Sequence, residues 1–187
     1  GGYAAAFRAA DLGKKVLLVD REPALGGVCL NRGCIPSKTL LHITRVMEET
    51  YALEGMGVSF GKPRIDIDSI QKWKNKVITK LNRGIAQMAK ARNIETLLGS
   101  AIFKSNSEIT ISTKAKKEIL SFDQCVIATG SSSASIPGIP MDHPNILTSK
   151  DALETQKVPE TLLIVGGGYI GLEMGTVYHA LGSKVSV

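Results

Sequence analysis

The chain has 187 residues, 43% of them hydrophobic, and a formal net charge of +6. This composition excludes a disordered tail, and the length allows one large or two small domains with an apolar core. The positive charge does not indicate a nucleic-acid partner. Many of the cations lie between residues 72 and 92, where helical spacing predicts a solvated face, and only 5% of the residues are aromatic.

Three cysteines are too few for the disulfide framework of a small secreted protein, and no apolar run reaches transmembrane length. We therefore expect no membrane span and a reducing compartment. The cytoplasm is the prediction, and the mitochondrial matrix fits equally well. The first residue is not methionine, so the absence of a signal peptide says little.

The chain begins with what matches the helix and second strand of a βαβ unit. Residues 4–12 are small and favour a helix, Gly13 ends it, and residues 16–19 predict a buried strand that ends at Asp20. The first strand of such a unit would precede Gly1.

Two longer helices are predicted next, because apolar residues recur at helical spacing over residues 40–51 and 70–88. Ser69 is a suitable cap for the second of them. Alternating stretches then predict strands of one small sheet. They cover residues 94–98, 108–112 and 118–122.

A nearly continuous apolar stretch, residues 124–128, predicts a buried strand ending in Thr129-Gly130-Ser131. Cys125 lies inside this stretch and is expected to be a buried hydrophobe. Residues 131–140 are rich in Ser, Gly and Pro and predict a linker.

A second βαβ pattern follows. Residues 162–165 predict a buried strand, residues 172–181 a helix closed by Gly182, and residues 185–187 the start of another strand. A glycine-rich turn joins the first two of these elements.

Gly166-x-Gly168-x-x-Gly171 fits the dinucleotide fingerprint, in which the glycines permit the tight turn, the approach of the pyrophosphate and close packing of helix on strand. The predicted strand before it and helix after it favour a nucleotide site over a mere tight turn. The acid that would bind the ribose lies beyond Val187, so NAD cannot be told from NADP.

Gly2 can be the last glycine of a similar fingerprint, with Asp20 at the end of the next strand as its ribose-binding acid. Taken alone, Asp20 would be read as an ordinary loop acid. With two nucleotide sites and a cysteine pair, one nucleotide can be a flavin and the other a nicotinamide.

The segment GGVCLNRGCIPSK, residues 26–38, carries Cys29 and Cys34 five positions apart. A zinc site needs more ligands than this pair supplies, and no further His or Cys clusters nearby. A structural disulfide would close a very short loop and would be unusual in a reducing compartment. A redox pair explains more. Pro36 suits the first turn of a helix, and a helix N-terminus lowers the pKa of a cysteine by favouring the thiolate.

This segment resembles the signature of the pyridine nucleotide-disulfide oxidoreductases, which are flavoproteins with a redox-active cysteine pair. GGGYIGLEMGTVYHALGS and the turn after Ala128 are similar to the same family, and the resemblance covers the whole chain. The form Cys-Leu-Asn-x-Gly-Cys-Ile-Pro-Ser-Lys is most similar to members that oxidise dihydrolipoyl groups. Glutathione reductases usually carry valines and a different residue before the lysine.

The resemblance implies an α/β fold with two truncated Rossmann-type domains. Residues 1–140 would be the FAD-binding domain, lacking its first strand, and residues 141–187 a linker and the inserted start of the NAD-binding domain.

Roles for single residues also follow from the resemblance. Cys29 would exchange with the dithiol substrate, Cys34 would be the thiolate that faces the flavin, and Lys38 would lie near flavin N5 and pair with Glu173. These four would be the catalytic residues. Asp20 would bind the adenosine ribose of FAD. The implied cofactor-binding positions are Gly2, Asp20, Arg21, Gly26, Gly27, Val28, Cys29, Lys38, Gly99, Thr129, Gly130, Ser131, Gly166, Gly167, Gly168, Tyr169, Ile170, Gly171 and Glu173.

The implied activity is FAD- and disulfide-dependent oxidation of dihydrolipoyl groups with NAD as electron acceptor. The partner would be the lipoyl-bearing acyltransferase or carrier protein of a 2-oxoacid dehydrogenase complex. The family's catalytic His–Glu pair comes from a C-terminal domain and acts across a homodimer, so this stretch alone is expected to be inactive. Alternatives are a glutathione or mercuric reductase that uses NADPH, and a non-catalytic flavin- or zinc-binding module.

Two positions depart from the family pattern. Arg32 stands where a small apolar residue is common and adds charge at the rim of the cysteine pair, and Ser132 replaces a common arginine. The three histidines match no catalytic position. They are His42, His143 and His179.

Overall fold

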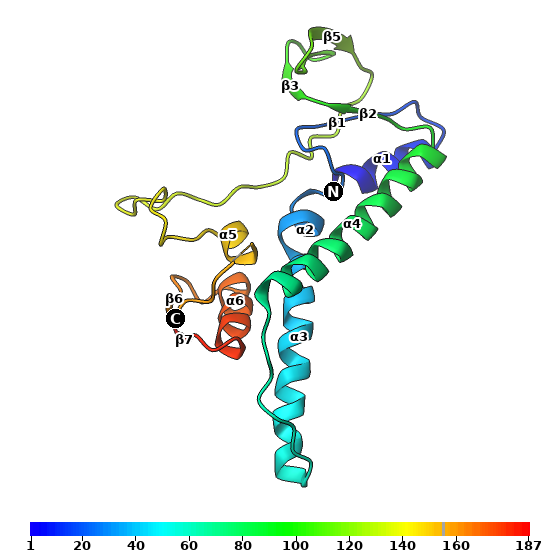
Figure 1. The fold of residues 1–187 in the computed structure, drawn as a ribbon. Coiled ribbons are helices and arrows are strands. Elements are labelled where there is room, and N and C mark those ends of the chain that lie inside the picture. Colours follow the sequence, from blue (N-terminus) through cyan, green and yellow to red (C-terminus); the bar gives the residue numbers. More distant parts are fainter. Residues whose placement is uncertain (155) are drawn as a thin grey trace. The chain divides into compact units, whose positions relative to one another are not determined.

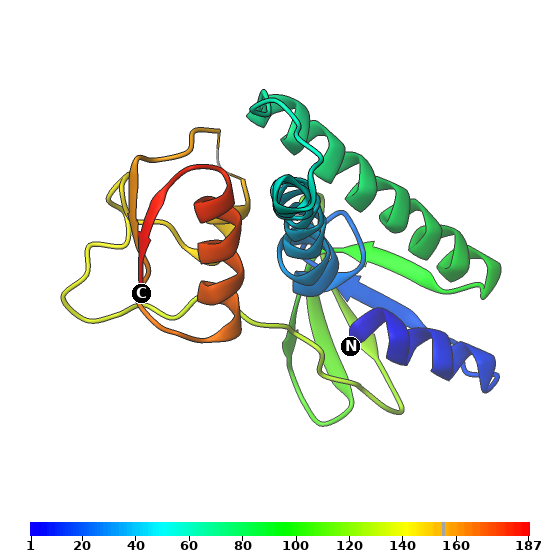
Figure 2. The ribbon, with the colours of Figure 1, turned by 90° about the horizontal axis from the view of Figure 1, so that it is seen from below.

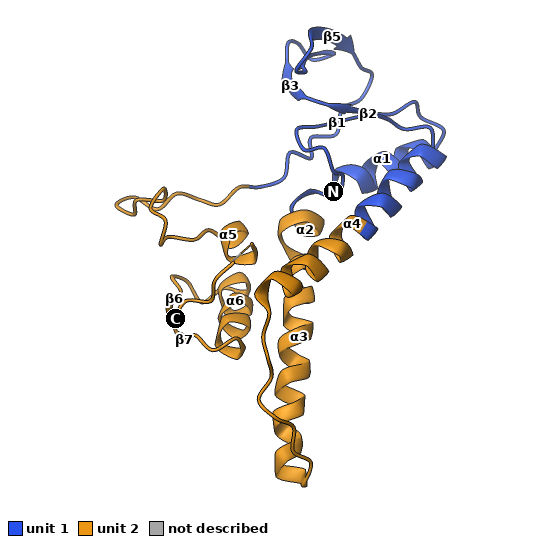
Figure 3. Ribbon diagram, in the orientation of Figure 1, with its two compact units in different colours: residues 1–28, 80–131 blue, residues 29–79, 132–187 orange. Residues whose placement is uncertain are grey.

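The computed structural model describes residues 1–154 and 156–187 and shows an α/β chain that divides into two compact units. Unit 1 consists of residues 1–28 and 80–131, and unit 2 of residues 29–79 and 132–187 (Figure 3). The predicted division at residue 140 assigns residues 1–140 to FAD and residues 141–187 to a linker and the NAD-binding domain, and it stays a prediction.

Unit 1 contains the first predicted βαβ elements. Helix α1 (Gly2–Asp11) leads into strand β1 (Leu17–Asp20), which pairs in parallel with β2 (Glu95–Leu98) (Figure 1). The small core between them buries Ala6, Phe7, Ala89 and Ile94. Gly13 turns the chain after α1 with φ of +78°, a conformation that favours glycine, so the predicted helix end is confirmed.

A separate antiparallel sheet of three strands completes unit 1. Its strands are β3 (Ser100–Phe103), β4 (Glu108–Ser112) and β5 (Lys117–Ser121), in that order. The prediction that residues 94–98 belong to this sheet is wrong, because β2 pairs with β1, and β3 was missed. Alternation identifies a strand but not its partner. Ile94, which precedes β2, is buried in the core with Ala6 and Phe7 of α1, and this burial favours pairing of β2 with β1.

The stretch at residues 124–128 was expected to be a buried strand, and this is wrong. No strand is assigned there, and the side chains of Cys125, Val126 and Ile127 are exposed. Within the described residues this stretch has no strand partner. An extended segment without a ladder leaves its apolar side chains in solvent.

Unit 2 contains the cysteine-bearing helix α3 (Cys34–Ala52), which continues into the short 3-10 helix η1 (Leu53–Met56). The preceding helix α2 (Gly27–Arg32) begins at the end of unit 1 and carries Cys29. The core of unit 2 joins α3 to α5 (Ser149–Leu153) and α6 (Tyr169–Ala180). It buries Leu40, Leu153, Met174, Val177 and Tyr178.

The second βαβ pattern is confirmed. Strands β6 (Thr161–Leu163) and β7 (Lys184–Ser186) pair in parallel, with α6 between them in the chain and packed beside them (Figure 2). Gly182 closes α6 with φ of +110°. The first strand is not buried as predicted, because Leu163 and Val165 each expose 71% of their surface and this two-stranded sheet leaves one face open.

Helix α4 (Ile67–Ala91) is longer than predicted and runs from unit 2 into unit 1. Asp66 caps it by accepting bonds from the backbone N–H and the hydroxyl of Ser69, so Ser69 is not the cap. Three side chains of the predicted apolar face are exposed, namely Trp73, Leu81 and Met88. The helix instead buries a face that includes Lys74.

Lys74 corrects the expectation that the cations after residue 72 are solvated. Its side chain is fully buried, and the ammonium donates to the carbonyl of Leu153 and to the carboxylate of Glu154, both at 2.8 Å. Tyr178 of α6 donates to the neighbouring carbonyl of Ala152 at 2.9 Å. Side chains from α4 and α6 thus satisfy the last carbonyls of the short helix α5. No helix in the described part of the chain is long and apolar enough to cross a membrane.

Replacing Lys74 by alanine is expected to lower the free energy of unfolding by about 2 kcal/mol, since the buried carbonyl of Leu153 keeps only the longer hydrogen bond from Gln71, at 3.2 Å, and a cavity opens. Urea unfolding of the full-length protein, followed by circular dichroism, measures the change. Lys76→Ala removes an exposed cation from the same helix and is the matched control, with an expected change within about 0.5 kcal/mol. Equal losses in the two variants would contradict the anchoring role of Lys74.

Candidate functional site

The two cysteines of the motif lie on consecutive helices. Cys29 is in α2, which ends at Arg32, and Cys34 is the first residue of α3. Gly33 separates the helices with φ of −148° and ψ of −111°. Both thiols are free and exposed, and the two side chains share a hydrogen bond. The structure therefore holds the pair as a dithiol, close together and open to a reactant.

The pKa of Cys29 is raised above its ordinary value. The hydrogen bond with the side chain of Cys34 contributes most, followed by burial and by the negative charge that Cys34 carries as a thiolate. The backbone of Cys34 and the ammonium of Lys38 act in the opposite direction without reversing the shift. The expectation of a lowered pKa is thus wrong for Cys29, because its hydrogen bond with the Cys34 side chain and its burial outweigh the charge of Lys38.

Lys38 and Glu173 form the ion pair that the resemblance implies. The Lys38 ammonium on α3 donates to Glu173 Oε1 on α6 at 2.5 Å. Glu173 exposes 22% of its side chain and Lys38 exposes 56%, so the carboxylate is held in the protein while the lysine spans its surface. Lys38 is the fourth residue after Cys34, one helical turn along α3.

Ser37 joins this group, although no role was predicted for it. It is 5% exposed, and its hydroxyl donates to the carbonyl of Cys34 at 3.2 Å. The Lys38 ammonium donates to the same hydroxyl oxygen at 3.5 Å, and the hydroxyl also reaches the carboxylate of Glu173. The signal that could have identified it is its position, because a serine three residues after the start of a helix can hydrogen-bond back to the carbonyl of that first residue.

The two partners of the ion pair shift in opposite directions. Burial is the largest influence on Glu173 and raises its pKa, but hydrogen bonds from Lys38 and Ser37 and the charge of Lys38 together outweigh it, so the net pKa is lowered. The hydrogen bond with Glu173 raises the pKa of Lys38. Stabilisation from Glu173 is therefore present above its ordinary value of 4.5 and is lost as pH falls through its folded pKa. Stabilisation from Lys38 is present below 10.5 and is lost at higher pH, so the pair is intact at neutral pH.

The second glycine fingerprint forms the turn that leads into α6. Gly166 has φ of +110°, and Gly168 caps α6. A Cβ on Gly166, Gly167 or Gly168 would meet nothing within 4 Å, whereas one on Gly171 would lie 2.9 Å from Ile164 Cγ2 and press on the carbonyl of Gly166. The first three glycines border open space at a helix N-terminus, and the fourth is required by packing.

The remaining predicted residues of this fingerprint are on the surface. Tyr169, the first residue of α6, exposes 73% of its surface, and Ile170 follows it in an exposed position. Both side chains are therefore accessible to a ligand at the start of α6.

The predicted FAD residues of unit 1 follow the ends of its strands. Asp20 is the last residue of β1, and its Oδ1 accepts from the backbone N–H of Glu22 at 3.0 Å. Gly26 and Gly27 have φ of +118° and +64°, and a Cβ on Gly27 would meet nothing within 4 Å. Both φ values favour glycine, and Gly27 borders open space.

Close packing accounts for two other glycines of unit 1. A Cβ on Gly99 would lie 2.7 Å from the carbonyl oxygen of Ser112, so glycine is needed there by the neighbouring strand. A Cβ on Gly2 would touch Ala128 at an ordinary 3.5 Å. The implied cofactor contacts of both residues stay predictions.

The turn after residue 128 is exposed. Gly130 has φ of +73°, and a Cβ on it would lie 3.9 Å from a side-chain carbon of Val28. Thr129 and Ser131 flank it in exposed positions. Arg21, which follows β1, is also exposed. The turn and Val28 are thus neighbours within unit 1.

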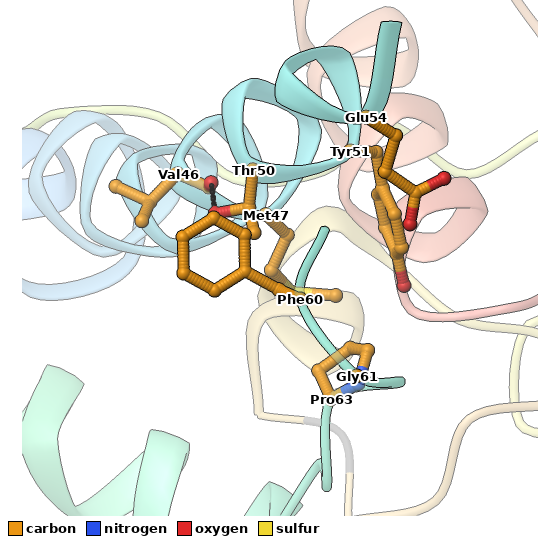
Figure 4. A pocket seen from close by; sticks show the side chains of 8 residues that line it. All are labelled: Val46, Met47, Thr50, Tyr51, Glu54, Phe60, Gly61 and Pro63. Carbon is orange, nitrogen blue, oxygen red and sulfur yellow. Dashed lines mark hydrogen bonds between the residues drawn. The ribbon is translucent and has the colours of Figure 1, made fainter. Parts of the chain in front are cut away.

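One cavity of unit 2 lies away from the cysteines. It has a volume of about 90 Å³ and is lined by Val46, Met47, Thr50, Tyr51, Glu54, Phe60, Gly61 and Pro63 (Figure 4). The Thr50 hydroxyl in its wall donates to the carbonyl of Val46 at 2.8 Å. Val46 is three turns along α3 from Cys34, about 18 Å at the helical rise, and no predicted site residue lines the cavity.

Among residues 1–154 and 156–187, no group of three or more His, Cys, Asp and Glu side chains is placed to hold a metal ion. The cysteine pair thus has no third ligand among the described residues.

The family model for pyridine nucleotide-disulphide oxidoreductases matches residues 1–187. The chain belongs to this family. The resemblance noted in the sequence is thereby confirmed, together with an α/β fold of the Rossmann type. The catalytic and cofactor-binding roles of single residues stay predictions.

Known members of the family show the same relationship. The chain is 51% identical over 186 residues to the dihydrolipoyl dehydrogenase of Vibrio parahaemolyticus and 48% identical over 187 residues to that of Haemophilus influenzae. In both comparisons all of this chain is covered and 39% of the relative, so the chain spans about two fifths of the length of these relatives.

A solved structure supports the fold. The HOCl-induced flavoprotein disulfide reductase RclA of Escherichia coli matches with a TM-score of 0.80 and 28% identity, over 98% of this chain and 38% of that protein.

Removing the Cys34 thiol is expected to lower the pKa of Cys29, because the hydrogen bond and the negative charge that raise it are lost. Cys34→Ala in the reduced full-length protein should therefore speed the alkylation of Cys29 by iodoacetamide at pH 8. Peptide mass spectrometry resolves the rate at Cys29. Cys125→Ala removes another exposed thiol and should leave that rate unchanged. Slower alkylation of Cys29 in Cys34→Ala would contradict this account.

The glycines of the second fingerprint should differ in their tolerance of alanine. Gly171→Ala is expected to lower the free energy of unfolding by about 1 to 3 kcal/mol, since the new methyl group overlaps backbone and Ile164. Gly168→Ala meets open space at an ordinary φ of −72° and should cost no more than about 0.5 kcal/mol. Thermal unfolding of the two full-length variants tests this ranking, and a reversed order would refute it.

Proposed function

We propose that the full-length protein is a dihydrolipoyl dehydrogenase, which oxidises dihydrolipoyl groups through FAD and a cysteine pair and uses NAD as electron acceptor. The observation that carries the proposal is the 51% identity to a dihydrolipoyl dehydrogenase over all of this chain, which includes the adjacent dithiol of Cys29 and Cys34. These 187 residues alone would not turn over, because the catalytic His–Glu pair of the family is not among them.

The residues present fit the two cofactors. For FAD, Gly27 borders open space at the start of α2, and the carboxylate of Asp20, at the end of β1, would bind a ribose hydroxyl. For NAD, the glycines before α6 leave room for a pyrophosphate at a helix N-terminus. When bound, the flavin supplies the chemistry that accepts two electrons from a dithiol and passes them as hydride to the nicotinamide.

The positions of the other proposed cofactor residues agree with these roles. Gly2, Arg21, Val28, Gly99 and the exposed turn at residues 129–131 would serve FAD in unit 1. Tyr169 and Ile170 would contact the nicotinamide cofactor at the start of α6.

The cysteine pair would exchange electrons directly with the substrate. In the oxidised enzyme, a substrate thiolate attacks the sulfur of Cys29, and Cys34 leaves as a thiolate. The second substrate thiol then displaces Cys29, so the substrate becomes a disulfide and loses two electrons and two protons. The raised pKa of Cys29 favours the protonated form of this thiol. The charge of the Lys38 ammonium would favour a thiolate at either cysteine.

The proposed partner is a lipoyl-bearing acyltransferase or carrier protein of a 2-oxoacid dehydrogenase complex, and the full-length protein would be a homodimer. The cytoplasm is the proposed compartment, because free cysteines and a reactive dithiol fit a reducing environment.

A related reductase is the second candidate, because the likeness to RclA at 28% identity shows that other disulfide reductases share this fold. Glutathione or mercuric ion with NADPH would then replace dihydrolipoamide with NAD. Ser37 before Lys38 favours the first proposal, since glutathione reductases usually carry a different residue there.

The full-length protein should show a flavin spectrum, a long-wavelength charge-transfer band on reduction with dithiothreitol, and oxidation of dihydrolipoamide with NAD. Cys34→Ser should lower kcat by at least about 1,000-fold, because the dithiol can no longer form a disulfide. Cys125→Ser is the matched control and should keep full activity. A flat visible spectrum, or an active Cys34→Ser variant, would sink the proposal, and activity with glutathione or mercuric ion alone would favour the second candidate.

A further inference from the structure

We infer that Ser37 is a positioning residue, whose hydroxyl links the Lys38–Glu173 ion pair to the first turn of α3 and so holds the Lys38 ammonium beside the Cys29–Cys34 dithiol. The inference rests on the proposed function only in treating that dithiol as the reactive group.

Ser37 is fixed in the protein from both its backbone and its side chain. Its N–H donates to the carbonyl of Gly33 at 3.0 Å, and its hydroxyl donates to the carbonyl of Cys34 at 3.2 Å. With 5% of its surface exposed, it has little access to water as an alternative partner. The hydroxyl oxygen is therefore a rigid point within the first turn of α3.

The hydroxyl has one hydrogen and two lone pairs. Its oxygen can accept from the Lys38 ammonium at 3.5 Å while its hydrogen is shared between the Cys34 carbonyl and the Glu173 carboxylate. Ser37 thus contacts both members of the ion pair and the backbone of the cysteine that begins α3.

Lys38 needs such a support. Its side chain is long and more than half exposed, and an exposed ion pair is weakened by the entropy of ordering both side chains. A second polar contact from a rigid residue restricts the ammonium to the position where it lowers the pKa of Cys29. Without it, the ammonium of Lys38 keeps its hydrogen bond to Glu173.

Thr39 shows what an ordinary buried hydroxyl does in the same turn. Its hydroxyl donates to the carbonyl of Ile35 at 2.7 Å, and it is 8% exposed. It has the same kind of local helix bond as Ser37, and this bond involves neither Lys38 nor Glu173. Thr39→Val is therefore a matched control that removes a buried hydroxyl without touching the ion pair.

The titratable groups at the dithiol are Cys29 on α2, Cys34 and Lys38 on α3, and Glu173 on α6. The test is the rate of Cys29 alkylation by iodoacetamide between pH 6 and pH 9, in the reduced full-length protein. This readout depends on the thiolate fraction and does not require turnover or lipoamide.

Ser37→Ala should slow the alkylation of Cys29 about threefold at pH 7.5, because the freed Lys38 ammonium stabilises its thiolate less. Thr39→Val should leave the rate within about 1.3-fold of the unsubstituted protein. An unchanged rate in Ser37→Ala, or an equal slowing in Thr39→Val, would overturn the inference.

A double-mutant cycle tests whether Ser37 acts through the ion pair. Glu173→Gln releases Lys38 by itself, so adding Ser37→Ala should slow alkylation by less than about 1.3-fold further. A full threefold slowing in both backgrounds would show that Ser37 acts independently of Glu173 and would overturn the inference. If dihydrolipoamide oxidation fails while these alkylation effects appear, the proposed function is wrong and the role of Ser37 stands.

Discussion

The contact between α3 and α6 is the constraint on which the chemistry of unit 2 depends. Leu40 of α3 packs against Val177 and Tyr178 of α6, and this apolar contact brings Lys38 to Glu173. The charge beside the cysteines is therefore set by hydrophobic packing two residues away along α3 and four residues away along α6. An exposed ion pair would not hold two helices together alone, since such pairs contribute little on average.

Helix α5 shows how polar groups support that packing. Five residues are too few for a stable isolated helix, yet backbone groups at both ends of α5 have hydrogen-bond partners. Thr148 and Asp151 form a capping box at its start, and Lys74 and Tyr178 satisfy carbonyls at its end. The cost of burying a lysine is offset because its ammonium finds a carbonyl and a carboxylate together.

The glycines of the chain divide into two physical kinds that a sequence motif does not distinguish. Gly99 and Gly171 are glycine because neighbouring backbone leaves no room for a side chain. Gly27 and Gly168 border open space, where a ligand would have access to the backbone. One fingerprint thus contains both a glycine required by packing and glycines that leave the backbone open.

The sequence alone determined the features that depend on near neighbours in the chain. Helical spacing and glycine stops located α1, α3 and α6, and the cysteine motif identified the family. The pairing of Lys38 with Glu173 followed from the resemblance to that family and not from spacing in the chain. Only the tertiary structure decided that β2 pairs with β1, that residues 124–128 stay exposed, and that Lys74 is buried. It also revealed Ser37 as a neighbour of the ion pair. The physical reason is that spacing fixes local backbone conformation, whereas strand partners, burial and the approach of distant side chains depend on contacts between segments far apart in the chain.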